Sequence, residues 1–100
     1  MDQLMPIPEG YRLRQNYPNP FNPSTTVEYG VPGDCQVTLK VYNLKGQLVR
    51  TLVNEYKLAG TYTATWDGRN EEGQRVASGT YLCKITAGGF SSTTKMVLVR

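Results

Sequence analysis

Apolar and polar side chains alternate along four short segments of this sequence, with the period of two that is typical of a strand with one buried face. The apolar members of these segments are Val27, Tyr29 and Val31; Val37, Leu39 and Val41; Tyr62, Ala64 and Trp66; and Tyr81, Cys83 and Ile85. Turn sequences rich in Gly, Pro, Asn and Asp separate them at short intervals. Because a single sheet of this size would leave one apolar face in water, the pattern predicts two packed antiparallel sheets.

The segment from residue 47 to residue 57 does not alternate in this way. Its apolar residues are Leu48, Val49, Leu52, Val53 and Tyr56, a spacing closer to a helical stripe. Three of its residues are β-branched, and the preceding turn at 43–46 predicts a hairpin. A strand through about residue 53 is therefore favoured over a helix.

The N-terminal part of the chain is rich in proline. Residues 1–10 are predicted to be a lead-in or linker, and residues 11–100 the folded domain. Residues 15–25 contain three more prolines and are predicted to run as a stiff, hydrogen-bond-poor segment across the sandwich, with Tyr17 and Phe21 anchored on the core. The alternative, a proline-rich ligand for a partner, is disfavoured because the segment is short.

Length and charge narrow the class of protein. The 100 residues suffice for one small domain, and 19% of them are charged. The net charge is +3, but the basic residues are scattered, so nothing indicates binding to a nucleic-acid backbone. No run approaches the roughly 20 apolar residues of a membrane-spanning helix. The first four residues do not resemble a signal peptide, so any export signal is expected upstream in a longer parent protein.

The residues needed for most enzyme mechanisms are missing. The sequence contains no His, so a Ser-His or Cys-His nucleophile pair is excluded. Glu71 and Glu72 lie together in a turn, where neither carboxyl group would gain the burial that raises a pKa. The loop from Asp67 to Gly73 is predicted to be a β-hairpin loop, because it lacks the ligand spacing of an EF-hand calcium site. We predict that the domain has no catalytic activity, no cofactor and no metal.

The two cysteines, Cys35 and Cys83, both have core-facing parity in the predicted strands. Together with Trp66 they give the Cys, Trp, Cys order of immunoglobulin domains, but the spacing differs. A disulfide between them and two free buried thiols remain alternatives, because bridging needs Cα atoms within about 7 Å.

Five motifs, taken together and in order, resemble the C-terminal sorting domain of type IX secretion cargo. They are Gln15 to Thr26 (QNYPNPFNPSTT), Val41 to Gln47 (VYNLKGQ), Trp66 to Asn70 (WDGRN), Val76 to Tyr81 (VASGTY) and Thr94 to Arg100 (TKMVLVR). The middle part also resembles the immunoglobulin-like domain of the flagellar hook-capping protein. The resemblance covers about residues 11–100 and implies an all-β fold, an immunoglobulin-like antiparallel sandwich of about seven strands.

The resemblance also implies a function. Domains of this family direct an attached upstream cargo domain through the periplasm and across the outer membrane of Bacteroidetes-like bacteria. The implied partners are the type IX translocon and a sortase-like peptidase, with possible attachment to lipopolysaccharide. The expected location is therefore the cell surface or the exterior.

The resemblance places the sorting signal near the C-terminus of the domain. The candidate residues are Gly79, Tyr81, Gly88, Gly89, Lys95, Met96, Val97, Leu98, Val99 and Arg100. A closing strand at the end of the domain can present a free edge, and such an edge is a template for pairing with another chain. The alternative is that Met96 and Leu98 only complete a sheet, while Lys95 protects its edge from aggregation.

Two other functions remain open. A structural immunoglobulin-like module would hold a neighbouring domain or subunit through a sheet face, and would be expected in a chain that continues after Arg100. A carbohydrate-binding module would need an exposed aromatic platform. Trp66, Tyr62 and Tyr81 share core-facing parity, which leaves Tyr42 and Tyr56 as poor substitutes.

Overall fold

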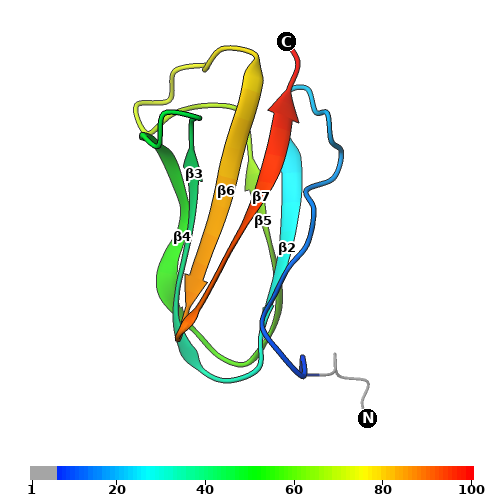
Figure 1. The fold of residues 1–100 in the computed structure, drawn as a ribbon, viewed down its shortest axis with the longest axis vertical. Coiled ribbons are helices and arrows are strands. Elements are labelled where there is room, and N and C mark those ends of the chain that lie inside the picture. Colours follow the sequence, from blue (N-terminus) through cyan, green and yellow to red (C-terminus); the bar gives the residue numbers. More distant parts are fainter. Residues whose placement is uncertain (1–6) are drawn as a thin grey trace.

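Two antiparallel sheets form the protein (Figure 1), of which the computed structural model describes residues 7–100. The strands are β1 (Arg12–Leu13), β2 (Thr25–Val31), β3 (Cys35–Tyr42), β4 (Leu48–Lys57), β5 (Gly60–Trp66), β6 (Gly79–Ala87) and β7 (Phe90–Leu98). One sheet has the order β1-β2-β5 and the other β4-β3-β6-β7. The predicted antiparallel sandwich of about seven strands is confirmed. Within residues 7–100, no helix is long and apolar enough to cross a membrane.

The core lies between the two sheets and is built from the alternating faces of the strands. Every apolar residue predicted to face inward on β2 and β3 is at most 1% exposed, as are Cys83 and Ile85 on β6. On β5 only Trp66 is fully buried, whereas Tyr62 and Ala64 are half-buried. The reason is that β5 lies at the edge of the smaller sheet, where fewer side chains cover its inner face.

Strand β4 runs to Lys57, beyond the end predicted near residue 53. Its pairing with β3 shifts register at two places, between Leu39 and Lys40 and between Val41 and Tyr42. Each shift adds a residue on β4 and breaks the period of two. These irregularities explain why the apolar spacing looked partly helical in a segment that is a strand.

The loop after Trp66 joins β5 to β6, and these strands belong to different sheets. It contains a small hairpin of its own, in which Arg69 and Arg75 form an antiparallel bridge. The main-chain N–H of Asn70 donates to the carbonyl of Gln74 at 2.9 Å. The loop therefore crosses from one sheet to the other while keeping a local hairpin turn.

Among residues 7–100, no group of three or more Cys, Asp or Glu residues is placed to hold a metal ion.

Both cysteines carry free thiols. Cys83 is completely buried in β6, and Cys35 is half-buried at the start of β3. Cys35 is the strand partner of Lys57, while Cys83 is opposite Val41, at the far end of β3. The disulfide alternative is therefore wrong for this fold.

Candidate functional site: the C-terminal hairpin and its strap

Strands β6 and β7 form the hairpin that holds all of the predicted recognition residues except the last two. Gly79 is opposite Leu98 and Tyr81 is opposite Met96, so these four residues lie together at one end of the hairpin. The Gly88-Gly89 turn lies at the other end, since it connects the two strands. The predicted residues thus form two separate groups along the length of the sandwich (Figure 1).

Burial divides the predicted residues into packing and surface positions. Met96, Leu98 and Tyr81 are 0%, 1% and 8% exposed and belong to the core. Val97 is half-buried. The exposed members are Gly79, Gly88, Gly89, Lys95, Val99 and Arg100. Met96 and Leu98 therefore stabilise the sandwich, each by about 1.5–3 kcal/mol of hydrophobic burial, and are not available as surface contacts.

The outer edge of β7 is covered by residues 15–21, which we call the strap. In Figure 1 the strap belongs to the blue segment that climbs beside β7 and β2. The main-chain N–H of Phe21 donates to the carbonyl of Val97 at 2.9 Å. The N–H of Val99 donates in turn to the carbonyl of Phe21 at 3.0 Å, which makes a parallel bridge. The prediction that β7 presents a free edge is therefore wrong along its C-terminal half.

Side-chain amides complete this cover. The Asn19 Oδ1 atom accepts a hydrogen bond from the Val97 N–H at 2.9 Å. The Gln15 Nε2 atom donates to the Lys95 carbonyl at 2.6 Å, and the Thr94 hydroxyl donates to Gln15 Oε1 at 3.1 Å. The prediction of a hydrogen-bond-poor segment is also wrong, because Asn and Gln side chains supply the bonds that the proline nitrogens cannot donate.

The strap is anchored on the core by Phe21, which is 2% exposed and lies 5.5 Å from the Trp66 ring, centroid to centroid. Tyr17 is 81% exposed, so the prediction that it anchors the segment is wrong. Its place is taken by the buried amide of Asn16, which donates to the Thr25 hydroxyl at 2.9 Å. That hydroxyl donates to the carbonyl of Pro18 at 2.8 Å, so the buried polar groups satisfy one another.

A second anchor lies at the Gly88-Gly89 turn. The Tyr11 ring stacks on the Phe90 ring with centroids 5.0 Å apart and planes 8° apart. A side-chain Cβ on Gly88 would collide with the Tyr11 hydroxyl, and the φ of Gly88 is +57°. The glycine at this turn therefore serves the packing of the N-terminal segment as well as the turn itself.

Arg100 fastens the end of the chain to the loop between β5 and β6. Its main-chain N–H donates to the Ser78 hydroxyl at 3.0 Å. Its guanidinium donates from Nε to the Val76 carbonyl at 2.8 Å and from Nη2 to the Gly68 carbonyl at 2.6 Å. Sequence reasoning placed Gly68 and Ser78 in motifs but did not connect either residue with Arg100.

Two aromatic side chains complete this end of the sandwich. Trp66 and Tyr81 meet edge to face with centroids 5.2 Å apart. The Trp66 Nε1 atom donates to the Arg69 carbonyl at 2.9 Å, and the Tyr81 hydroxyl donates to the Ala77 carbonyl at 2.6 Å. Burial raises the pKa of Tyr81, against a smaller lowering by the charge of Arg100. Trp66 is fully buried and cannot form a carbohydrate platform.

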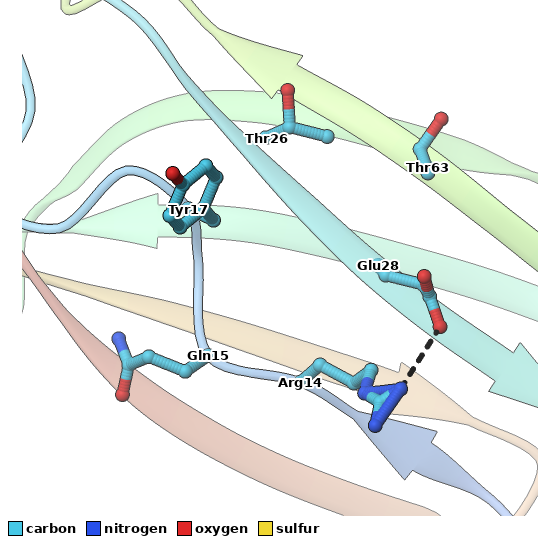
Figure 2. Close-up of a pocket in the computed structure, with 6 residues that line it drawn as sticks. All are labelled: Arg14, Gln15, Tyr17, Thr26, Glu28 and Thr63. Atoms are coloured by element: carbon cyan, nitrogen blue, oxygen red, sulfur yellow. Dashed lines mark ion pairs between the residues drawn. The ribbon is translucent and has the colours of Figure 1, made fainter.

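A hollow of about 440 Å³ lies on the three-stranded sheet beside the strap. Figure 2 shows its lining residues, with Arg14 and Glu28 facing each other. Their side chains form an ion pair at 3.6 Å, and both are substantially exposed. The hollow is open, and its two charged side chains are paired with each other.

The match to a protein-family model decides the family. The model is described as the FlgD Ig-like domain, and it matches residues 22–89. The chain belongs to the FlgD Ig-like domain family. The basal-body rod modification protein FlgD of Salmonella typhimurium is 38% identical over 68 residues, as is FlgD of Salmonella typhi. The alignment covers 64% of this chain and 29% of each relative, so the chain spans less than a third of the length of these relatives.

Two solved structures share the fold of this Ig-like domain. Dimeric latent PorU from Porphyromonas gingivalis superimposes with a TM-score of 0.64 and 22% identity, over 99% of this chain and 10% of PorU. PorZ is a surface component of the type IX secretion system of the same bacterium. It superimposes with a TM-score of 0.57 and 21% identity, over 92% of this chain and 12% of PorZ. The predicted immunoglobulin-like sandwich is confirmed. The strap and β7 lie outside the family match at 22–89 but largely within the structural likeness.

Proposed function

We propose that this Ig-like domain is a non-catalytic sorting module that directs an attached cargo protein through the type IX secretion system to the bacterial cell surface. The supporting observation is the extent of the likeness to PorU and PorZ, which includes nearly the whole chain. The cargo would precede the domain in a longer chain and would pass through the periplasm. The translocon and a sortase-like peptidase would be its partners, and lipopolysaccharide attachment would follow cleavage.

The surface that a translocon would contact is the C-terminal corner, defined as Gly79, Val99 and Arg100. All three residues are exposed and lie at the same end of the β6–β7 hairpin. The edge of β7 is occupied by the strap, so strand addition there would first require the strap to leave. Contact with the corner requires no such rearrangement, and this favours recognition of the folded domain.

Deleting residues 95–100 would be a poor test, because it removes two core side chains together with the corner. The sharper test is Val99→Asp, since the Val99 side chain is 49% exposed and the change places a charge in the centre of the corner. The matched control is Leu58→Asp in the turn between β4 and β5, where the side chain is 63% exposed. Thermal unfolding should show that both variants stay folded.

In a bacterium with a type IX system, cargo fused to the Val99→Asp domain should accumulate in the periplasm. Cargo carrying Leu58→Asp should reach the surface as the unmodified fusion does. Normal secretion of a folded Val99→Asp fusion would refute recognition at the corner. Periplasmic retention of both variants would show that the assay reports a general loss of fitness of the fusion.

The match to FlgD favours a second candidate, a structural module that holds a neighbouring domain or subunit through a sheet face. This function predicts that the isolated domain self-associates or docks tightly onto the domain beside it in its parent protein. Light scattering on the purified domain, alone and with that neighbour, measures both. If the domain is a monomer and does not bind the neighbouring domain, this second function is excluded.

A further inference from the structure

The outward face of the four-stranded sheet combines an apolar row with a lysine cluster. Strand register aligns its side chains in rows across the sheet. One row consists of Leu48, Tyr42, Leu82 and Lys95, and the next consists of Thr51, Lys40, Lys84 and Thr93. Alternation points these residues away from the core, because Val41, Cys83 and Met96 beside them are fully buried. Nothing in the described part of the chain forms a third layer over this face.

The three lysines of this face lie close together, with no acidic partner within residues 7–100. Lys40 is directly opposite Lys84, and Lys95 lies one row away on the neighbouring strand. Like charges directly opposite each other destabilise a sheet. The ion pairs within residues 7–100 involve none of the three lysines. Glu71, which meets the edge of β4 at Thr51, is already paired with Arg50 at 3.5 Å.

A shallow hollow of about 270 Å³ lies across the two rows. It is lined by Tyr42, Gly46, Leu82, Lys84 and Thr93. Leu48, the row neighbour of Tyr42, is 49% exposed. The face therefore offers a partly apolar hollow that can accept a side chain, with Lys84 in its lining and Lys40 and Lys95 on the neighbouring strands. A flat bilayer surface could not fill such a hollow, whereas a protruding side chain of a protein could.

We propose that this face is a docking surface for an acidic segment of a partner protein. An apolar side chain of that segment would enter the hollow, and flanking carboxylates would pair with Lys40, Lys84 and Lys95. Charge complementarity selects this occupant. A second copy of the chain is disfavoured, because two such faces would repel each other and the domain has a net charge of +3. The inference goes beyond sorting and does not depend on the C-terminal corner.

The test uses the 100-residue domain and the acetylated, amidated peptide Asp-Glu-Phe-Glu-Asp as the probe. Backbone amide NMR shifts locate binding, and a titration at low salt gives the association constant. The shifts should cluster on Tyr42, Leu82 and Lys84. The same peptide with Ala in place of Phe should bind more weakly, and added salt should weaken both.

Lys84→Glu should lower the association constant roughly fivefold or more, because a reversal removes an attraction and adds a repulsion. Arg12→Glu is the matched control, since Arg12 is exposed on β1 of the other sheet. Equal losses in both variants would mean that only net charge matters and would overturn the proposal. So would peptide shifts on another face, or Lys84-dependent binding to phosphatidylglycerol vesicles without binding to the peptide.

Discussion

The Arg100 guanidinium donates a hydrogen bond to the main-chain carbonyl of Gly68 at 2.6 Å, across 32 residues of sequence. The contact depends on Gly68 having no side chain. A Cβ atom built there would lie 2.9 Å from Arg100 Nη2 and 3.1 Å from the carbonyl oxygen of Pro23. The glycine of the Trp-Asp-Gly motif therefore provides the space in which the Arg100 guanidinium packs.

Gly68→Ala should lower the free energy of unfolding by about 2.5–6 kcal/mol. Gly68 has a φ of +76°, and holding an L-residue in this region costs about 1–3 kcal/mol. The new methyl group would also displace the guanidinium, and a hydrogen bond from a charged group contributes about 1.5–3 kcal/mol. Urea unfolding followed by tryptophan fluorescence measures the loss, since Trp66 is buried beside this loop.

Gly73→Ala separates the cost of backbone strain from the cost of crowding by the new side chain. Gly73 has a φ of +83°, but nothing lies within 4 Å of an added Cβ, so this variant carries only the backbone strain. It should lose less stability than Gly68→Ala. The difference should shrink when both changes are repeated in an Arg100→Ala background, where only the crowding of the new Cβ against the Pro23 carbonyl remains. Equal losses at the two glycines with Arg100 present would mean that the arginine contact adds nothing.

Phe21→Ala should destabilise the domain by about 3–5 kcal/mol, because it removes a buried ring in contact with Trp66. It should also loosen the strap from β7 and so expose the edge of that strand. Hydrogen exchange at the Val97 and Val99 amides measures this second effect, because the strap accepts a hydrogen bond from each of them. Tyr17→Ala, in the same segment but 81% exposed, should change stability by less than about 0.5 kcal/mol.

Alternation of residue types was sufficient to predict the faces of β2, β3 and β6. In these strands one side meets the core and the other meets water, so the period of two survives. The alternation with a period of two fails in β4, because each register irregularity adds one residue to the strand. The hydrophobicity pattern does not show where such an extra residue lies. It is also less informative in β5, where an edge position leaves inward residues such as Tyr62 partly exposed.

The candidate site was harder to predict than the fold. Resemblance located the C-terminal strand, but the cover on its edge depends on pairs such as Gln15 and Lys95, which are 80 residues apart in sequence. Whether an amide side chain reaches an unpaired strand edge is a matter of three-dimensional distance. The exposure of Tyr17 and the burial of Asn16 could not be predicted for a similar reason. A proline-rich segment has no regular period, so its sequence does not show which side chains face the core.

The Cys83 thiol should make the domain less stable at alkaline pH. Burial raises the pKa of Cys83 from its ordinary value of 9.0 to about 12. Above pH 9 the thiol ionises in the unfolded chain but stays neutral in the folded one, so its stabilising contribution is complete below pH 9 and is lost as the pH rises toward 12. The free energy of unfolding should fall by up to about 1.4 kcal/mol per pH unit in this range from Cys83 alone. Burial also raises the pKa of Tyr29 from 10.0 to about 12, which adds to the slope above pH 10. Urea unfolding at pH 8, 9 and 10 should show a shallower slope for Cys83→Ala than for the unmodified domain; identical slopes in the two proteins would contradict the assignment.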